Sequence, residues 1–224
     1  MPQSGSDEAL TAALVADRAQ AIALSGEIVS RETWARLDRF VALLIERQKT
    51  LNLVAASTLP QIWTRHVADS LQLLALAPTA RKWIDLGTGA GFPGIVIACA
   101  LAETPGAQVH LVESKQKKAA FLRDVAAALS LPAIVHLRRI EEFVADNTQS
   151  FDAVTARALA PLDKLLGYAI PLLKTGAVGL FPKGRDVAAE LTQASKSWRI
   201  KFELIPSKTD PHGRIVLVRG AVKR

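Results

Sequence analysis

Between residues 82 and 196, short β-rich runs alternate with helical segments, and this alternation restricts the possible folds more than any other feature of the chain. The β-rich runs span residues 83–86, 109–113, 134–140, 151–155 and 177–181. The helical segments lie near residues 93–101, 115–129, 161–174 and 185–196. This order predicts an α/β protein with a doubly wound, mostly parallel sheet that helices cover on both faces.

The two ends of the chain differ from this middle part. Residues 202–206 and 214–219 have strand character with no helix between them, which predicts a C-terminal antiparallel hairpin. Three helical segments, at about 8–24, 31–51 and 58–76, follow a loose tail over residues 1–8, and Ser30 is placed to cap the second helix. We therefore expect an N-terminal tail and helical cap over residues 1–81 and a larger domain over residues 82–224.

Composition excludes several classes of protein. Half of the residues are hydrophobic and 22% are charged, as in a globular chain rather than a disordered or fibrous one. The single cysteine, Cys99, cannot form an intramolecular disulfide, and four scattered histidines do not predict a metal site. The uncharged run 86–102 contains four glycines and a proline, so it does not predict a membrane span. No Arg- or Lys-led apolar segment opens the chain, so we expect a cytoplasmic protein.

A glycine-rich loop follows the first strand and precedes a helix. It reads DLGTGAGFPG over residues 85–94, and its glycines let the backbone approach a ligand beside a helix N-terminus. Gly89, Gly91 and Gly94 match a dinucleotide-binding spacing, but Gly87 already begins the turn, and Asp85 places a carboxylate where a pyrophosphate would dock. A carboxylate suits a cationic ligand instead, such as S-adenosylmethionine (AdoMet). We expect Asp85, Gly87, Gly89 and Gly91 to belong to an AdoMet site.

An acidic residue, Glu113, ends the second strand, 22 residues beyond Gly91. A carboxylate at this place accepts both hydroxyls of an unphosphorylated ribose. NAD and AdoMet share that ribose, so Glu113 favours an adenosine ligand and argues only against NADP.

Several segments together resemble one known family, RsmG, also called glucose-inhibited division protein B, the small-subunit ribosomal RNA methyltransferase G family. The segments are residues 85–95, ESKQKKAAFL at 113–122, RIEE at 139–142, TARA at 155–158, Asn52-Leu53, RHVADSL at 65–71 and Lys183-Gly184. The resemblance extends over roughly residues 30–220.

This resemblance implies a class I methyltransferase fold and AdoMet-dependent methylation of ring nitrogen 7 (N7) of a guanine in 16S ribosomal RNA, at position 527 in the usual numbering. The expected partner is accordingly 16S ribosomal RNA or the small ribosomal subunit. The family's cofactor contacts fall on Gly87, Phe92, Ile140, Glu141 and Arg157.

The residues themselves are compatible with an N7 acceptor. Methylation of exocyclic amines usually comes with an Asn/Asp-Pro-Pro-aromatic motif after the fourth strand, where this chain reads TARALAP at residues 155–161. Methylation of pyrimidine carbon 5 needs a cysteine nucleophile, and Cys99 lies in an apolar helix as a packing residue. A free lone pair on N7 needs neither device and no general base, so no catalytic acid or base is assigned.

Arg157 is the candidate for positioning the reactants, because it follows the fourth strand beside the expected switch point of the sheet. It would bind the AdoMet carboxylate or a phosphate of the target nucleotide. The alternative is a salt bridge to Asp152 or Asp163.

His66, Asp69 and Ser70 invite comparison with a catalytic triad, but they fall within five residues on one expected helix. Neighbours on a helix do not form a nucleophile site. We interpret them as polar contacts between the cap and the larger domain, or with the substrate.

The net charge of +7 is concentrated at the end of the chain, where residues 196–224 hold eight basic side chains against Glu203 and Asp210. Such a stretch is either a polyanion-binding face or a solubilising surface. The candidate RNA-binding residues are Lys183, Lys208, Arg214 and Arg219. A second basic cluster is formed by Lys115, Lys117, Lys118, Arg123, Arg138 and Arg139.

Three alternatives remain open from the residues alone. They are a class I methyltransferase for a small molecule or protein, a non-enzymatic AdoMet-sensing RNA-binding module, and a dehydrogenase.

Overall fold

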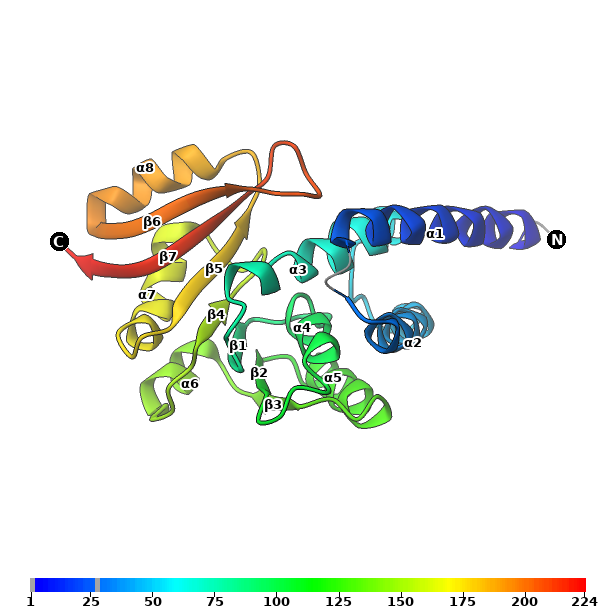
Figure 1. Cartoon of the computed structure of the whole chain (residues 1–224), viewed down its shortest axis with the longest axis horizontal. Coiled ribbons are helices and arrows are strands. Elements are labelled where there is room, and N and C mark those ends of the chain that lie inside the picture. The colour runs from blue at the N-terminus through cyan, green and yellow to red at the C-terminus, as the bar shows by residue number, and fades with distance from the viewer. Residues whose placement is uncertain (1–2, 27–28) are drawn as a thin grey trace.

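A seven-stranded sheet forms the centre of the molecule in a computed structural model, which describes the backbone of residues 3–26 and 29–224 and the side chains from Glu8 onward within those ranges (Figure 1). The strand order is β3-β2-β1-β4-β5-β7-β6. The strands are β1 (Lys82–Leu86), β2 (Gln108–Glu113), β3 (Ala133–Leu137), β4 (Ala153–Thr155), β5 (Val178–Lys183), β6 (Trp198–Pro206) and β7 (Arg214–Lys223).

The first five strands are parallel, and β7 pairs antiparallel with both β5 and β6. This confirms the predicted α/β class, the mostly parallel sheet and the C-terminal hairpin. The hairpin is longer than expected, since β6 begins at Trp198 rather than at residue 202.

Helices cover both faces of the sheet. They are α4 (Gly94–Ala100), α5 (Gln116–Ala128), α6 (Ile140–Asp146), α7 (Leu162–Leu173) and α8 (Val187–Ser197). Successive residues of a strand point to opposite faces. Trp83 of β1 accordingly joins the core that contains residues of α4 and α5, while Ile84 joins the core that contains residues of α6, α7 and α8.

The N-terminal cap contains α1 (Gln3–Ser25) and α2 (Arg31–Gln48), and the Ser30 side chain caps α2 by accepting from the Thr33 N–H at 3.1 Å. The expected loose tail is wrong for the described residues, since α1 already begins at Gln3 and projects beyond the sheet (Figure 1). Phe40 and Leu44 of α2 share one apolar core with α4. None of the helices in the described part of the chain has the length and apolar character to cross a membrane.

The third helix expected in the cap is broken into short pieces. They are η2 (Ala56–Gln61), η3 (Trp63–Ala68), α3 (Asp69–Leu71) and η4 (Leu74–Leu76), of which η3 has π-helical hydrogen bonding. Pro60 lacks an N–H donor inside η2. The buried Asp17 carboxylate of α1 accepts from the N–H groups of Trp63 and Thr64 at 2.7 and 3.2 Å, which fixes the start of η3.

The region after the second crossover also differs from expectation. β3 ends at Leu137 rather than at residue 140, and α6, which lies between β3 and β4, is not among the helices expected from the sequence. The available signal was the pair Glu141 and Glu142, because acidic side chains favour the first turn of a helix.

The order of the strands places a switch point between β1 and β4. The chain leaves β1 toward β2 and β3, and it later leaves β4 in the opposite direction toward β5. The loops after β1 and β4 therefore open a crevice at the carboxyl ends of two adjacent strands, which is where ligands bind in doubly wound sheets.

The start of α4 is packed against β1 and β2 with no room for a side chain. A Cβ on Gly94 would overlap the Leu111 side chain and lie 2.9 Å from Asp85 Oδ2, whereas a Cβ on Gly167 in α7 would meet no atom within 4 Å. We expect Gly94→Ala to lower the free energy of unfolding by about 1–3 kcal/mol, and the matched Gly167→Ala to raise it by about 0.5–1 kcal/mol. Urea unfolding measures both, and an equal gain in the two variants would contradict the packing described.

Candidate functional site

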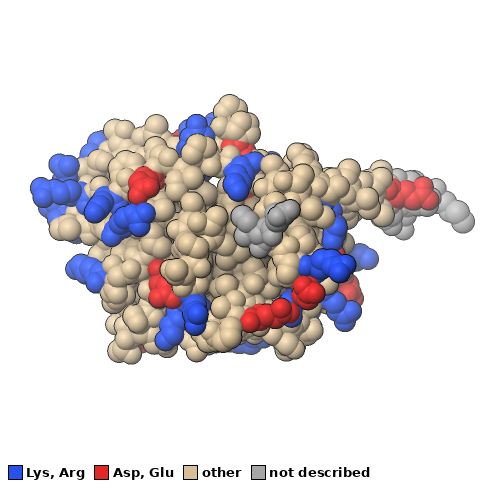
Figure 2. All heavy atoms as spheres, in the orientation of Figure 1, with Lys and Arg blue, Asp and Glu red and all other residues tan. Residues whose placement is uncertain are grey.

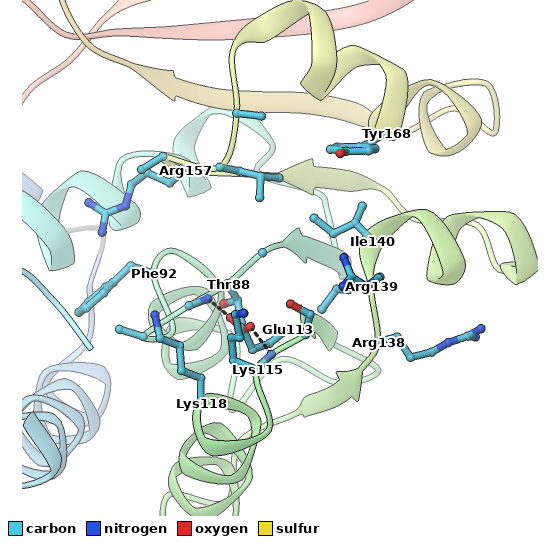
Figure 3. Close-up of a pocket in the computed structure, with 18 of the residues that line it drawn as sticks. Thr88, Phe92, Glu113, Lys115, Lys118, Arg138, Arg139, Ile140, Arg157 and Tyr168 are labelled. Atoms are coloured by element: carbon cyan, nitrogen blue, oxygen red, sulfur yellow. Dashed lines mark hydrogen bonds between the residues drawn. The ribbon is translucent and has the colours of Figure 1, made fainter. Parts of the chain in front are cut away.

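A cavity of about 520 Å³ opens at the switch point. The glycine loop after β1, the end of β2, the start of α6 and the loop after β4 all contribute to its walls, and the cap adds Leu53, Val54 and His66. In the close-up, Glu113 lies near the middle of these groups, with Arg157 and Phe92 on one side and Ile140 and Tyr168 on the other (Figure 3).

The glycine loop bends through backbone conformations that residues with a side chain rarely adopt. Gly87 has φ +70° and Gly89 has φ +58°, and both line the cavity. A Cβ on Gly89 would meet no protein atom closer than Gly87 O at 3.8 Å, so open space lies directly beside this backbone. The loop can therefore accept a ligand against its main chain, as its glycine content predicts.

Glu113 is held beside this loop at the end of β2. Its carboxylate accepts from the Gly89 N–H at 3.1 Å and from the Lys115 N–H at 2.7 Å, while the residue lines the cavity. Each carboxylate oxygen has lone pairs to spare after one such bond. Glu113 can therefore accept further hydrogen bonds from a ligand's hydroxyl groups, and its role toward a ribose stays a prediction.

Two residues assigned to the site lie behind the loop instead. Asp85 is 1% exposed, and its carboxylate accepts from the Gly94 N–H at 3.0 Å and from Thr155 Oγ1 at 2.9 Å. Burial raises the pKa of Asp85 to about 6, against the lowering effect of these hydrogen bonds. Gly91 does not line the cavity, and a Cβ on it would lie 2.7 Å from Ile95 Cγ1. The expected direct contact between Asp85 and a cationic ligand is thus not how the structure uses this carboxylate, which ties β1 to α4 and β4.

The residues after β3 form a wall of the cavity. Ile140 and Glu141 begin α6 and line the cavity, as do Arg138 and Arg139. The Tyr168 hydroxyl of α7 donates to Glu141 Oε1 at 2.9 Å. Tyr168 is not among the site residues expected from the sequence, because nothing in the local pattern of α7 indicates which helix it contacts.

Arg157 lies at the wall between the cavity and the cap, with its side chain 19% exposed. Its guanidinium donates to Arg65 O at 2.9 Å and to His66 Nδ1, and lies 3.5 Å from Asp69 Oδ2. The alternative partners Asp152 and Asp163 are therefore wrong. The interpretation as contacts between the cap and the larger domain is confirmed for His66 and Asp69, whereas Ser70 is buried and donates to His66 O within the cap.

A second cavity, of about 1150 Å³, adjoins the first and shares this wall with it. His66, Arg157 and residues 158–160 line both cavities. Of the candidate RNA-binding residues, Lys183 and Arg214 line the second cavity, whereas Lys208 and Arg219 lie outside it. Lys183 Nζ donates to Glu190 Oε2 and Ala160 O, both at 2.7 Å.

Cys99 is fully buried in α4, and burial raises the pKa of its thiol to about 12. This confirms the prediction that it is a packing residue. In the part of the chain that the structure describes, no group of three or more His, Cys, Asp or Glu side chains is arranged to hold a metal ion.

Comparison with known proteins shows that the sequence is similar to one family of methyltransferases. A sequence profile of the GidB family, described as rRNA small subunit methyltransferase G, matches residues 33–215. The chain is 56% identical over 221 residues to the ribosomal RNA small subunit methyltransferase G of Bradyrhizobium diazoefficiens, covering 99% of this chain and 84% of that protein. It is 54% identical over 210 residues to the protein of the same name from Rhodopseudomonas palustris, covering 94% and 88%.

Solved structures support the fold. The O-methyltransferase TomG from Streptomyces achromogenes, in complex with SAM, superposes with a TM-score of 0.59 at 16% identity and covers 92% of this chain and 98% of that one. An O-methyltransferase from Bacillus cereus, in complex with SAH, gives a TM-score of 0.54 at 16% identity, covering 80% and 90%. At such identities the likeness concerns the architecture alone.

The position of Glu113 leads to a prediction for AdoMet affinity. Glu113→Ala removes a charged acceptor that faces the cavity, so we expect AdoMet to bind more weakly by about 1.5–3 kcal/mol in calorimetry. Glu142→Ala, which removes an equal charge from an exposed position outside the cavity lining, is the control and is expected to bind normally. Equal affinity of the parent protein for S-adenosylhomocysteine and its 2′-deoxy form would argue against the ribose contact.

Proposed function

The chain belongs to the rRNA small subunit methyltransferase G family, and we propose that it transfers a methyl group from AdoMet to N7 of a guanine in 16S ribosomal RNA. AdoMet is the methyl donor of this family. The observation that carries the proposal for this chain is the pair of adjoining cavities, one at the glycine loop and one lined by both basic and acidic side chains, that meet at Arg157.

The residues around the first cavity fit AdoMet. The open space beside Gly89 would accept a ligand against the main chain, and Glu113 would accept hydrogen bonds from ribose hydroxyls. The contacts that the family implies, Gly87, Phe92, Ile140, Glu141 and Arg157, all line the same cavity. When bound, AdoMet supplies an electrophilic methyl group on a sulfonium sulfur.

The protein's task toward the acceptor is alignment rather than proton transfer. Guanine N7 carries a free lone pair, so its methylation needs no base, and an in-line displacement is accelerated by holding the two reactants in register. Burial lowers the pKa of His66 to about 3, with Arg157 and Arg65 acting in the same direction. His66 is therefore neutral at physiological pH and cannot protonate an acceptor nitrogen placed beside it.

The second cavity suits a segment of RNA. Basic side chains line it from three parts of the fold: the cap, the end of β5 and the start of β7. These side chains are Arg65, Lys183, Arg185 and Arg214, and the acidic side chains that line the same cavity are Asp17, Asp69, Asp186, Glu190 and Asp210. Outside it, Lys and Arg gather at the end of the molecule where β6, β7 and α8 lie (Figures 1 and 2). Phosphate groups bind such surfaces without regard to sequence, so this face would hold the RNA while the cavity receives the target nucleotide.

The proposed reaction has a direct test in cells. Mass-spectrometric mapping of 16S ribosomal RNA from cells lacking this gene should show one 7-methylguanosine lost, and a plasmid copy should restore it. Persistence of the modification would contradict the proposal. Transfer of labelled methyl from AdoMet to a small molecule or protein, with none to RNA, would favour the alternative methyltransferase, and binding of AdoMet and RNA without turnover would favour a sensing module.

The C-terminal basic surface leads to a second prediction. Lys208 and Arg219 are exposed and lie outside both cavities, although Arg219 pairs with Glu203 at 3.1 Å. Changing both to Ala should weaken RNA binding roughly 10- to 50-fold at 0.1 M salt, and binding should fall less steeply as the salt concentration rises, because fewer phosphate contacts release fewer counterions. AdoMet affinity should stay the same.

The charge-matched control changes Lys117 and Arg123, which are exposed on α5. If the control flattens the salt dependence and the first double variant does not, the RNA-binding face lies over α5 instead.

A further inference from the structure

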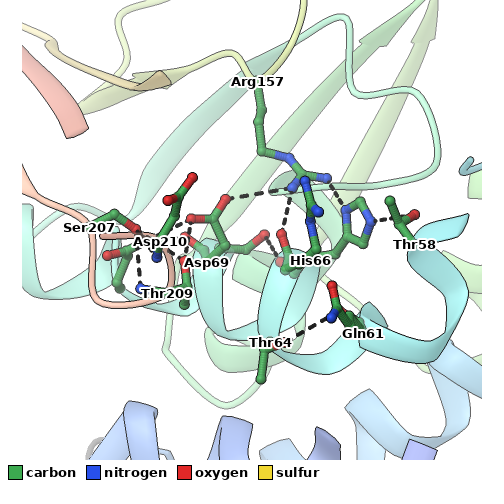
Figure 4. Close-up of polar contacts among 12 residues, drawn as sticks. Thr58, Gln61, Thr64, His66, Asp69, Arg157, Ser207, Thr209 and Asp210 are labelled. Atoms are coloured by element: carbon green, nitrogen blue, oxygen red, sulfur yellow. Dashed lines mark hydrogen bonds and ion pairs between the residues drawn. The ribbon is translucent and has the colours of Figure 1, made fainter. Parts of the chain in front are cut away.

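The guanidinium of Arg157 is held from one short stretch of the cap. Its hydrogen-bond and ion-pair partners Arg65 O, His66 Nδ1 and Asp69 Oδ2 come from residues 65–69 (Figure 4). Arg157 itself follows β4, so these contacts join segments about 90 positions apart in the sequence. Two of these partners have different roles. Asp69 compensates the positive charge of the guanidinium, and His66 accepts a hydrogen bond from the other guanidinium nitrogen.

The contacts of His66 select one form of its ring. Because Arg157 can only donate, Nδ1 of His66 must be the unprotonated, accepting nitrogen. Nε2 then carries the hydrogen and donates to Thr58 Oγ1 at 3.1 Å, and the Thr58 hydroxyl donates in turn to Ala55 O at 2.8 Å. The imidazole is therefore a neutral acceptor in a fixed tautomer, anchored from behind by η2.

The same ring also touches the cofactor side. The centroid of His66 lies 4.9 Å from that of Phe92, and the Arg157 guanidinium carbon lies 5.4 Å from the centroid of the Phe92 ring. Phe92 belongs to the glycine loop segment and lines the first cavity. His66 thus packs on a wall of the first cavity while it orients a cation that lines both cavities.

Asp69, the acidic partner of the guanidinium, is in turn connected to the loop between β6 and β7. Asp69 Oδ1 accepts from Thr209 Oγ1 at 2.9 Å and from Gln72 Nε2 at 2.8 Å, and Gln72 Oε1 accepts from the Lys208 N–H at 2.9 Å. Burial raises the pKa of Asp69, while Arg157 and these hydrogen bonds act against the rise. A chain of direct contacts therefore runs from the hairpin loop through Asp69 to Arg157.

We infer that His66 is a positioning residue for methyl transfer: its Nδ1 fixes the Arg157 guanidinium at the wall where the two cavities meet. The inference rests on the proposed function, since that wall is where the methyl donor and the acceptor nucleotide would approach each other. Because in-line transfer depends on alignment, a guanidinium free to swing would slow the reaction even with both substrates bound.

Two substitutions at the same position separate this role from simple packing. In His66→Asn the amide oxygen takes a place close to that of Nδ1, so an acceptor for Arg157 remains. In His66→Gln the amide reaches the place of Nε2, so the contact with Thr58 remains and the acceptor for Arg157 is lost. Both variants remove the ring from Phe92, so thermal unfolding should show a similar loss of stability in the two.

The measurements are the single-turnover rate of methyl transfer to 16S ribosomal RNA at saturating protein and AdoMet, and the AdoMet dissociation constant. We expect His66→Gln to slow the rate roughly 10- to 100-fold, the size expected when a buried charged donor loses its acceptor, and His66→Asn to retain most of the rate. AdoMet affinity should follow the same order, because Arg157 lines the cofactor cavity. Equal behaviour of the two variants in both measurements would overturn the inference.

A separate result would concern the proposed function. If the wild-type protein transfers no methyl group to 16S ribosomal RNA, the proposed acceptor is wrong. In that case weaker AdoMet binding by His66→Gln than by His66→Asn would still support the positioning role, and equal binding would reject it.

Discussion

The geometry of the site depends on the hydrogen bonds that the buried carboxylate of Asp85 accepts. Asp85 is the fourth of the five residues of β1, and its two oxygens bind the first N–H of α4 and the hydroxyl of Thr155 at the end of β4. A carboxylate removed from water is costly unless it is well hydrogen-bonded, and its raised pKa reflects that cost. In return, one side chain joins the two strands at the switch point to the helix that follows the glycine loop. The loop between these fixed points can then keep its open backbone conformation.

The cap completes the site rather than merely covering the sheet. Its α2 shares an apolar core with α4, and its broken segment, η2 to α3, supplies the partners of Arg157. A regular helix over residues 58–76 would present its side chains at fixed intervals. The π-helical turn of η3, anchored by Asp17, instead directs the carbonyl of Arg65, the ring of His66 and the carboxylate of Asp69 toward one guanidinium.

The two cavities divide the work of the proposed reaction. The first combines open main chain, a carboxylate and apolar side chains, which suits a nucleoside, while the second is lined by basic and acidic groups and adjoins the basic surface of β6 and β7 (Figure 2). They share a wall that contains Arg157 and His66. Since the acceptor nitrogen needs no deprotonation, holding the two ligands in direct contact and in line where the cavities meet, beside Arg157, is a sufficient strategy for catalysis.

The sequence by itself determined the features that depend on local pattern. Strand and helix alternation, the glycine loop, Glu113 at the end of β2 and the family segments all depend on residues close together in the chain, and they led to the fold, the cofactor and the general place of the site. Even the orientation of Asp85 was available in principle, because it lies two residues after Trp83 and therefore shares its face of the sheet, the one covered by α4.

Only the tertiary structure decided which distant groups meet. Arg157 pairs with Asp69 and His66 rather than with Asp152 or Asp163, which are nearer in the sequence. Tyr168 donates a hydrogen bond to Glu141 of another helix. Such pairings depend on how the cap and α7 pack against the sheet, and a local pattern contains no information on that packing. A charged side chain can form an ion pair with any oppositely charged group close to it. Which group that is depends on the tertiary structure that brings the two together.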